Sequence, residues 1–254
     1  MNLAIDIGNS FTHFAVYKDS RNVYTYNCSS ISKIDLAKAV KKINKNFGII
    51  KIGIASVSPD TIKTIKSHIR KEFRISPLTI NNKTKLPVKI IIKNSNTLGS
   101  DRICNAAFGY NMVKGKSNVL VIDLGTANTY DLVLKNGDFV GGIIAPGIMT
   151  SSKALNLNTG KLPLFEYSKL SAIAPLIGRN TFEAIQSGLV NYMKYATEGL
   201  VKAIKNHYRG KLTVVITGGS AKFLGKKLNF KHIYETNTVL EGINIILNHQ
   251  DSSI

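Results

Sequence analysis

Three aspartates lie in short motifs whose neighbouring residues are of types that bind phosphate groups. Asp6 opens the motif DIGNS, Asp123 opens DLGTA, and Asp101 lies in GSDR. A glycine near the aspartate lets backbone N–H groups approach a phosphate closely, and a carboxylate can hold Mg²⁺ through the water ligands of the metal. Phosphoryl transfer needs bound phosphates, a metal ion and a base for the acceptor hydroxyl. The three motifs together are therefore candidates for that chemistry.

Each motif alone also has an ordinary structural explanation. Asp, Gly and Asn favour turns, so DIGNS by itself is typical of a hairpin turn. Asp101 beside Arg102 is most often a helix cap or a surface ion pair. In the functional interpretation, Asp101 is the general base for a substrate hydroxyl and Arg102 holds a substrate anion. The spacing within the motif does not decide between these interpretations.

An internal repeat favours the functional interpretation of the two D-x-G motifs. Residues 3–18 and 119–135 each show an apolar strand, a D-x-G turn and a second apolar strand, which is the pattern of a β-hairpin. When Asp6 is aligned with Asp123, the glycines of the two turns align as well. Two copies far apart predict a duplicated two-domain fold. Facing turns in such a fold can hold the phosphates of one nucleotide from both sides.

Strand and helix patterns alternate along the chain, which predicts an α/β fold. Apolar residues at helical spacing predict helices over 34–47, 60–73, from Asp101 onward, 180–208 and 239–247. Apolar runs predict strands over 49–57, 87–92 and 211–216. We expect two domains, 1–115 and 116–254, with the boundary in the loop at 114–117.

Two glycine-rich stretches and one helix start complete the set of candidate motifs. TGGSA at 217–221 follows a strand and precedes a helix, where a base, a ribose or an anion could bind, and a plain loop explains it equally well. GGIIAPG at 141–147 is expected to be a loop after a strand, with tight packing as its simplest explanation. Asn180 and Glu183 form a capping box, which leaves Thr181 as a candidate substrate contact.

The composition limits the class of protein. The formal net charge is +19, from 34 basic and 15 acidic residues, and only six of the basic residues are arginine. This charge fits a solvated surface, an anionic substrate or a nucleic-acid partner. Two cysteines without a CxxC pair predict neither a zinc site nor a disulfide framework. No apolar run is long enough to span a membrane and no secretory pattern opens the chain, so we expect a cytoplasmic protein.

In order along the chain, these motifs are similar to those of the type III pantothenate kinase family. The matching stretches cover nearly the whole sequence: DIGNS at 6–10, ASVSP at 55–59, LGSDR at 98–102, DLGTA at 123–127, GGIIAPG at 141–147, TGKLP at 159–163, IGRNTFEAIQSG at 177–188, TGGSA at 217–221 and TVLEGI at 238–243. Each stretch is weak evidence alone, but nine in the order of the family are hard to obtain by chance.

The resemblance implies a fold, a reaction and a set of cofactors. The implied fold is the duplicated actin-like (ribonuclease H-like) fold, with ATP in the cleft between two domains. The implied reaction is the ATP-dependent phosphorylation of pantothenate to 4'-phosphopantothenate, the first step of coenzyme A biosynthesis. The implied cofactors are Mg²⁺ and a monovalent cation, K⁺ or NH₄⁺. The family also implies a homodimer with substrate sites near the subunit interface, for which the helix starting at Asn180 is the candidate contact.

The resemblance also assigns roles to individual residues. The catalytic base is Asp101, and the monovalent cation binds at Asp123. The chemistry of the D-x-G turn itself, rather than the resemblance, makes Asp6 the candidate to hold Mg²⁺ through water. ATP binding is assigned to the first turn and to one threonine of the second: Asp6, Ile7, Gly8, Asn9, Ser10, Phe11, Thr12, His13 and Thr126. Pantothenate binding is assigned to Gly99, Ser100, Asp101, Arg102 and Thr181.

Three positions depart from the usual pattern of the family. Ser10 replaces a threonine and keeps the hydroxyl, Ser100 replaces the commoner alanine, and Ile92 stands where many members have a tyrosine. The last departure concerns the pantothenate pocket more than the ATP site.

Two other functions fit parts of the sequence. The charge of +19 fits a nucleic-acid-binding transcriptional accessory factor on the same scaffold. The presence of Asp6, Asp101 and Asp123 together argues against that as the sole function, so we do not expect a nucleic-acid partner. A sugar or acetate kinase of the same superfold is the third alternative, although such chains are generally longer.

Overall fold

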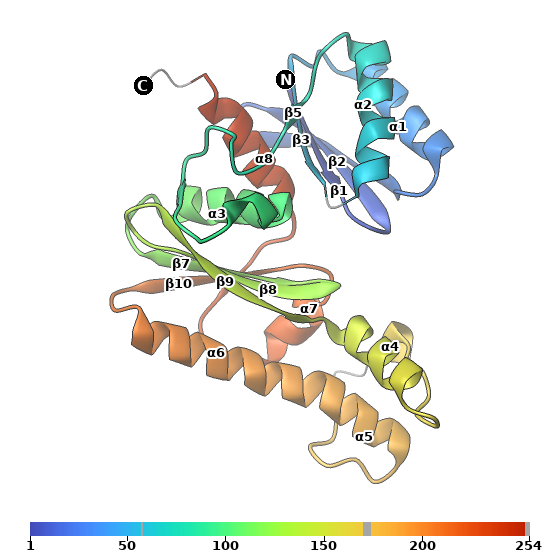
Figure 1. Ribbon diagram of the computed structural model, residues 1–254, viewed down its shortest axis with the longest axis vertical. Helices are drawn as coiled ribbons and strands as arrows, with labels where there is room; N and C mark the ends of the chain where they lie inside the picture. The colour runs from blue at the N-terminus through green and yellow to red at the C-terminus, as the bar shows by residue number, and fades with distance from the viewer. Residues whose placement is uncertain (57, 170–173, 252–254) are drawn as a thin grey trace. The chain divides into compact units, whose positions relative to one another are not determined.

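The computed structural model describes residues 1–56, 58–169 and 174–251 of the chain (Figure 1). The chain divides into two compact units, which are treated separately below. Unit 1 comprises residues 1–116, 133–141 and 237–254, and unit 2 comprises 117–132 and 142–236. The first segment of unit 1 ends at residue 116, one residue after the boundary expected between residues 115 and 116. The expected division differs from the observed one because 133–141 and the C-terminal segment belong to unit 1.

Unit 1 is built on a five-stranded sheet with the strand order β3-β2-β1-β4-β5. The central strand β1 (Asn2–Ile7) pairs antiparallel with β2 (Phe11–Lys18) and parallel with β4 (Lys51–Ser56). The outer strands are β3 (Arg21–Ser29), antiparallel to β2, and the short β5 (Leu78–Thr79), parallel to β4. The expected strand at 49–57 is thus confirmed over 51–56, and Val57 lies outside the described residues.

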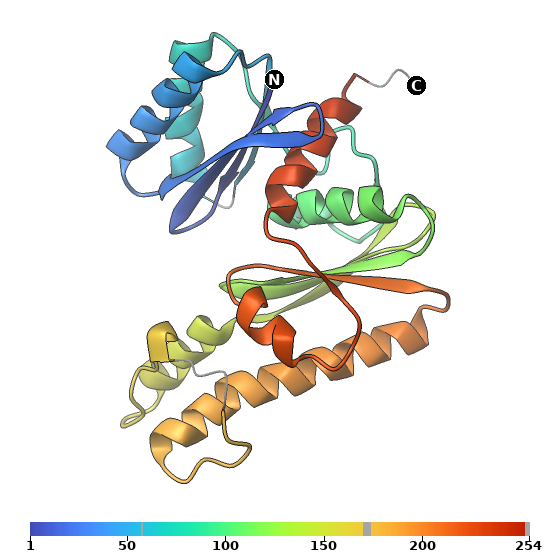
Figure 2. The same ribbon diagram turned by 180° about the vertical axis from the view of Figure 1, so that it is seen from behind.

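The two faces of this sheet are covered by different helix pairs. Leu3, Ile5 and Ile7 of β1 pack with helices α1 (Lys33–Asn46) and α2 (Pro59–Phe73). Ala4 faces the other way, toward α3 (Ser100–Val113) and α8 (Thr238–His249). Figures 1 and 2 show these pairs on opposite sides of the sheet. Because successive strand residues alternate between faces, Asp6 belongs to the face of α3 and α8.

Helix α8 explains why the C-terminal segment belongs to unit 1. Its residues Leu240, Ile243, Ile246 and Leu247 are buried against α3 and strand β1, and Thr238 Oγ1 donates a hydrogen bond of 2.7 Å to Asn105 Oδ1 of α3. A Cβ on Gly242 would collide with the backbone of Cys104, so the two helices approach closely at a glycine. Sequence periodicity predicts this helix but not the sheet on which it packs.

The second sheet has the strand order β11-β10-β7-β8-β9-β6. Its central strands are β7 (Asn118–Leu124), β8 (Ala127–Val133), β9 (Asp138–Pro146) and β10 (Leu212–Thr217). The edge strands are β11 (Ile233–Tyr234) and β6 (Lys89–Ile90), which pair parallel with β10 and β9. β7 pairs parallel with β10, as β1 does with β4, so the repeat seen in the sequence extends to the strand pairing.

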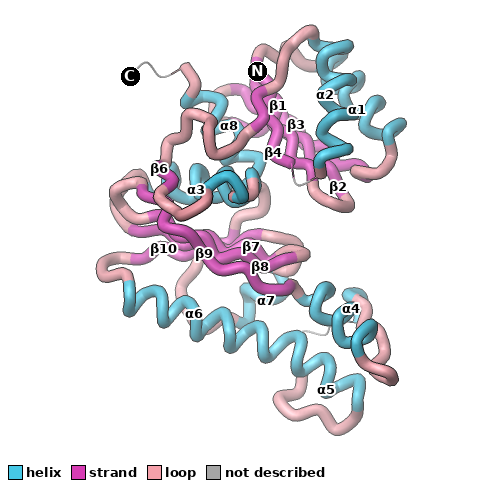
Figure 3. Tube along the Cα trace, in the orientation of Figure 1, coloured by secondary structure: helices cyan, strands magenta, loops and turns pink. Residues whose placement is uncertain are grey.

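The long helix expected over residues 180–208 is present in unit 2 as three consecutive helical segments. Helix α5 (Thr181–Ser187), a π-helical turn at Gly188–Tyr192 and helix α6 (Met193–His207) follow one another along one rod (Figure 3). Helix α4 (Ile148–Asn158) and the short α7 (Ala221–Leu224) complete the set. Short 3-10 turns lie at Ser95–Thr97, Tyr167–Lys169 and Gly225–Lys227. Among the described helices, none is both long and apolar enough to cross a bilayer.

One local expectation is wrong. Residues 141–147 were expected to form a loop, but strand β9 continues to Pro146, and only Gly147 lies beyond it. Exposed and partly buried residues alternate along 141–146, which is the pattern of a strand with one solvated face. Gly141 has φ of +113°, and a Cβ there would lie 3.3 Å from Ile92, so glycine provides both a backbone conformation and room inside this strand.

Candidate active site

The first D-x-G turn is braced from strand β3. Gly8–Ser10 link β1 to β2, and the N–H of Gly8 donates to the carbonyl of Phe11 at 3.0 Å. Ser30 holds both ends of this turn: its hydroxyl donates to the carbonyl of Gly8 at 2.8 Å and its N–H donates to that of Ser10 at 3.0 Å. The buried hydroxyl of Thr12 donates in turn to Ser30 Oγ at 2.9 Å. Nothing in the sequence around Ser30 indicates this role, because its partners lie about twenty residues away.

The side chains of the first turn divide into exposed and buried groups. Asn9, Ser10 and Phe11 are exposed, so they can meet a nucleotide in solution. Ile7 and Thr12 are fully buried, so any contact they make with a nucleotide is through the backbone. The ring of His13 is hydrogen-bonded to Asn27: the His13 Nδ1 atom lies 2.9 Å from the Asn27 Oδ1 atom. Of the residues predicted to bind ATP, some can therefore contact a nucleotide with their side chains and others only with their backbone.

Asp6 and Asp101 come together within unit 1. Asp6 is paired with Ala55 of β4, and the next pair is Ile7 with Ser56. Burial raises the pKa of the Cys104 thiol well above its usual value, and the charges of Asp6 and Asp101 raise it further. The backbone geometry agrees, because Ser56, which pairs with the residue after Asp6, donates its N–H at 2.8 Å to Ser100, the residue before Asp101. The structure brings these two aspartates, 95 residues apart in the sequence, to the same end of the sheet.

The start of helix α3 is fixed to strand β4 by Ser100. The N–H of Ser56 donates to Ser100 Oγ at 2.8 Å, and this hydroxyl donates back to the carbonyl of Ser56 at 3.2 Å. The preceding Gly99 has an extended backbone, and a Cβ there would collide with the carboxylate of Asp101. Arg102 lies beside them, with its guanidinium carbon 5.9 Å from the centre of the Phe139 ring. Gly99 and Ser100 of the GSDR motif thus have separate structural roles, one leaving room for the Asp101 carboxylate and the other fastening the helix to the sheet.

Asp123 and the TGGSA motif lie together within unit 2. Asp123 is paired in register with Thr217, the last residue of β10. Gly218 follows with φ of +95°, and a Cβ on it would collide with the Asp123 carboxylate and the backbone of Leu124. The N–H of Ser220 donates to the carbonyl of Leu124 at 2.9 Å. The glycines of TGGSA are therefore explained first by packing against the second D-x-G turn.

The second turn is also held by the start of helix α4. Thr126 has an exposed side chain, and its carbonyl accepts hydrogen bonds from the N–H of Gly147 at 3.0 Å and from Thr150 Oγ1 at 2.6 Å. A Cβ on Gly147 would collide with the carbonyl of Gly125. Tight packing was the simplest explanation of the GGIIAPG motif, and it accounts for Gly147, the last glycine of that motif.

Thr181 lies on a separate element of unit 2, at the first position of helix α5. Asn180 caps this helix by accepting from the N–H of Glu183 at 2.9 Å, as the capping box predicts. Glu183 does not complete the box at Asn180, because its Oε2 accepts from the N–H of Arg179 at 2.8 Å. Thr181 itself is exposed, and none of its described contacts involves Asp123 or Thr126.

The carboxylates of the site fit a water-mediated magnesium ion. Among the described residues, no three His, Cys, Asp or Glu side chains are grouped so that they could hold a metal by themselves. Mg²⁺ keeps several water ligands and is commonly bound by one or two carboxylates together with substrate phosphates. A single carboxylate such as Asp6, at the end of a strand beside a glycine turn, is sufficient for that mode of binding.

Comparisons with known proteins identify the family of this chain. The family model described as type III pantothenate kinase matches residues 2–203. The type III pantothenate kinase of Sulfurihydrogenibium sp. (strain YO3AOP1) is 34% identical over 96% of this chain and 98% of its own length. That of Persephonella marina is 34% identical over 96% of both chains. Among solved structures, a ROK family protein from Streptococcus pneumoniae TIGR4 superposes with a TM-score of 0.52 at 10% identity, covering 98% of each chain, and supports the actin-like fold alone. The chain belongs to the type III pantothenate kinase family.

Proposed function

We propose that this protein transfers the γ-phosphoryl group of ATP to the primary hydroxyl of pantothenate and so forms 4'-phosphopantothenate, the first step of coenzyme A biosynthesis. The observation that carries the proposal is the placement of Asp101. Its carboxylate lies at the first turn of α3, beside the strand ends that present Asp6, in a chain of this family. A sugar or acetate kinase of the same superfold is less well supported, since the family assignment spans most of the chain.

Asp101 acts as the general base in this proposal. Its carboxylate accepts the proton of the pantothenate hydroxyl while that oxygen bonds to the γ-phosphorus and the bond from phosphorus to the bridging oxygen of ADP breaks. Gly99 leaves room for the carboxylate, and Ser100 anchors the helix that bears it. Arg102 provides a positive charge for the pantothenate carboxylate, and Thr181 provides a hydroxyl.

The two D-x-G turns bind the nucleotide in this proposal. The exposed Asn9 and Ser10 offer polar groups to the phosphates, and the Gly8 backbone can approach them closely. Thr126 contributes from the second turn. Asp6 would hold Mg²⁺ through water and Asp123 a K⁺ or NH₄⁺ ion, and these cations supply neutralisation of the phosphate charge.

We also infer a homodimer formed through unit 2. An apolar cavity of about 1030 Å³ lies there, lined by residues of β8, α4 and the rod of α5 and α6, including Tyr130, Leu155 and Met193. Two of the large apolar side chains that line it are exposed, Tyr192 at 75% and Leu155 at 38%. Apolar surface of this extent favours burial against a second copy of the chain. We place the enzyme in the cytoplasm, where ATP is available.

A coupled assay of ADP release tests the reaction. Purified protein with ATP, Mg²⁺ and pantothenate is assayed in K⁺ and, in parallel, in Na⁺. We expect release that depends on pantothenate and is much faster in K⁺ than in Na⁺. Release without pantothenate dependence, or none from a protein that binds ATP, would reject pantothenate as the acceptor.

Two aspartate variants test the assignment of the base. Asp101→Asn keeps the shape of the side chain and removes its basicity, so turnover should fall by roughly 10²–10⁴-fold while ATP binding is retained. Asp60→Asn is the matched control, since Asp60 is also in the first turn of a helix, α2, and is exposed. Equal activity of the two variants would remove Asp101 from its role.

A further inference from the structure

A polar cavity of about 340 Å³ lies in unit 1 at the opposite end of strand β1 from Asp6. Its wall includes Tyr17, which pairs in register with Asn2, whereas Asp6 pairs with His13 four residues along the strand. At the rise of a β-strand, four residues correspond to roughly 13 Å. The cavity is therefore separate from the end of the sheet where Asp6 and Asp101 meet.

One face of helix α8 forms much of the cavity wall. Glu241, Asn244, Ile245, Asn248 and His249 all line the cavity, and their spacing of three and four residues places them on one side of the helix. The opposite side carries Ile243 and Leu247, which are buried in the core of unit 1. This helix thus directs a mainly polar face toward a cavity lined also by strand β2 and helix α3.

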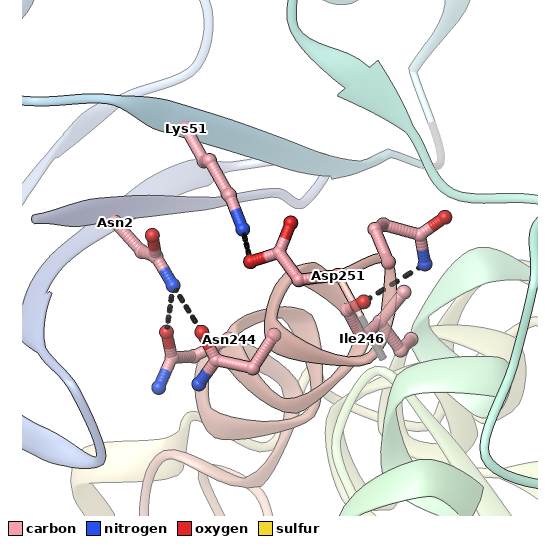
Figure 4. A network of polar contacts seen from close by, with 7 residues as sticks. Asn2, Lys51, Asn244, Ile246 and Asp251 are labelled. Carbon is pink, nitrogen blue, oxygen red and sulfur yellow. Dashed lines mark hydrogen bonds and ion pairs between the residues drawn. The ribbon is translucent and has the colours of Figure 1, made fainter. Parts of the chain in front are cut away.

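A network of amides orients the polar groups of this wall (Figure 4). Asn2 Nδ2 donates to Asn244 Oδ1 at 2.8 Å and to Asn248 Oδ1 at 2.7 Å. Asn244 Nδ2 donates to the carbonyl of Asp19 at 2.9 Å, so both ends of the Asn244 amide are used. The Asn248 oxygen is held toward Asn2, which directs its N–H₂ group away from Asn2. The wall is therefore fixed by bonds within the protein before any ligand arrives.

Tyr17 supplies the observation that points to a ligand. Its side chain lines the cavity and is 1% exposed, and its hydroxyl makes no hydrogen bond of ordinary geometry with a described residue. Burial raises the pKa of Tyr17 well above its usual value, the charge of Glu241 raises it further, and Asn22 offsets part of the rise. The phenol is therefore neutral at physiological pH and can both donate and accept a hydrogen bond. Buried hydroxyls without a partner are uncommon, so this one is best explained by a partner that binds from outside the chain.

We infer that this cavity binds a small uncharged molecule that carries hydroxyl or amide groups. The chain has 34 lysines and arginines, yet among the described residues that line the cavity there is neither a lysine nor an arginine. A phosphate or carboxylate would meet the Glu241 carboxylate there and, among the described wall residues, neither a lysine nor an arginine, which disfavours ATP and pantothenate. Hydroxyl and amide groups match the Tyr17 hydroxyl and the Asn111 and Asn248 amides. The site is thus additional to the proposed reaction.

The cavity borders the helix that carries the proposed base. Asn111 lies near the C-terminal end of α3, and Asp101 lies in the first turn of the same helix. Helices α3 and α8 are also joined by the close approach of Gly242 to Cys104. A molecule in the cavity contacts both helices and should stabilise their packing, so binding is expected to raise the melting temperature.

Methyl NMR of the full-length protein tests the site with named probes. The δ1 methyl of Ile245 reports on the cavity, and that of Ile246, which is buried elsewhere on α8, is the internal control. Glycerol, acetamide and myo-inositol are the uncharged probes, and acetate and ethylammonium are the charged ones. We expect at least one uncharged probe to shift the Ile245 signal in a saturable way at millimolar concentration, with weaker or no saturation by either ion.

Two conservative variants decide which groups are used. Tyr17→Phe should weaken binding of that probe at least tenfold without lowering the melting temperature of the free protein, because the hydroxyl makes no hydrogen bond of ordinary geometry with a described residue. Tyr130→Phe is the control and should lower the melting temperature, because its hydroxyl is bonded to Thr197 Oγ1 at 2.9 Å. Glu241→Gln should leave the affinity for the uncharged probe within threefold. No saturable shift with any uncharged probe, stronger binding of acetate or ethylammonium, or full binding by Tyr17→Phe would overturn the inference.

Discussion

The hydroxyl of Ser100 and the backbone of Ser56 are joined by two hydrogen bonds, of 2.8 and 3.2 Å. This contact fastens the first residue of helix α3 to the last residue of strand β4, beside Asp101 on one side and the strand of Asp6 on the other. The first turn of α3, and with it Asp101, is therefore tied to the sheet by this contact.

Ser100→Ala should therefore reduce stability more than activity. Both bonds to Ser56 are lost, which should lower the free energy of unfolding by about 1–2 kcal/mol. Turnover should change little, because alanine is smaller than serine and leaves the Asp101 side chain in the first turn of α3. Urea unfolding and the ADP-release assay measure the two effects. Ser76→Ala, at an exposed position, is the control and should change neither. A large loss of turnover at unchanged stability would mean that Ser100 contacts the substrate.

Gly99→Ala should affect catalysis strongly. A Cβ at this position collides with the Asp101 carboxylate, which must then rotate away. A misplaced base of this kind costs on the order of 10²-fold in turnover. Isothermal titration with a non-hydrolysable ATP analogue should show unchanged binding, since the first turn is not altered. Gly48→Ala, where a Cβ meets nothing within 4 Å, is the control. Full activity of Gly99→Ala would show that the carboxylate is not required in its observed position.

Much of this arrangement could be predicted from residue patterns. The two D-x-G motifs form hairpin turns because Asp and Gly favour turns between apolar strands. Asn180 caps a helix because the offset of three residues to Glu183 brings its side chain to a free N–H. These features depend on residues within one turn of each other, so a local pattern is enough to specify them.

The remaining features depend on pairing between distant segments. Strand β3 was not among the expected strands, although its alternating Tyr24, Thr25 and Tyr26 are typical of a strand at the edge of a sheet. Ser30 braces a turn that lies in a different part of the sequence, and Gly218 meets Asp123 only because β10 and β7 are neighbours. No periodicity reports which strands become neighbours, so these contacts could be found only in the structure.

Gly218→Ala should destabilise unit 2, whereas Gly219→Ala should not. Gly218 has a positive φ and no room for a Cβ beside Asp123, but a Cβ on the adjacent Gly219 meets nothing within 4 Å. Strain and collision together should lower the free energy of unfolding by about 2–4 kcal/mol. Thermal unfolding of both variants compares them directly. If Asp123 binds the monovalent cation, Gly218→Ala should also reduce activation by K⁺. Equal stability of the two variants would contradict the packing described here.

Ser30→Ala should weaken ATP binding through the turn that Ser30 holds. The lost hydroxyl frees the carbonyl of Gly8 and leaves the buried Thr12 hydroxyl without its acceptor. The loss is worth about 1–2 kcal/mol, which corresponds to a several-fold to roughly 30-fold rise in KM for ATP if it falls on the bound turn. Steady-state kinetics at saturating pantothenate measures it. Ser29→Ala is the matched control, because Ser29 Oγ accepts a longer bond of 3.3 Å from the nearby N–H of Ile31 and is not bonded to the first turn among the described residues. An unchanged KM for ATP would mean that the turn keeps its shape without Ser30.

Cys104 should make stability depend on pH in alkaline solution. Burial, together with the charges of Asp6 and Asp101, raises the pKa of this thiol in the folded state, so it stays protonated there. In the unfolded chain a thiol ionises above about pH 8.5. The folded state then binds more protons than the unfolded state, and the stability present below pH 8.5 is lost at about 1.4 kcal/mol per pH unit as the pH rises toward the raised pKa.

Cys104→Ala should remove this contribution to the slope. Urea unfolding of the wild type and the variant between pH 7 and pH 10 should give a constant difference in free energy below about pH 8.5 and a narrowing one above it. Cys28→Ala is the control for the second thiol, whose pKa is also raised, by burial first and then by Asp35, but less strongly. The charges of Asp6 and Asp101 add to the rise in the pKa of Cys104. In Asp101→Asn, where one of these charges is removed, the pKa of Cys104 should be lower, so the loss of stability with pH should level off at a lower pH than in the wild type. Parallel stability curves for wild type and Cys104→Ala up to pH 10 would mean that the thiol ionises at the same pH in the folded protein as in the unfolded chain, and that its pKa is not raised by folding.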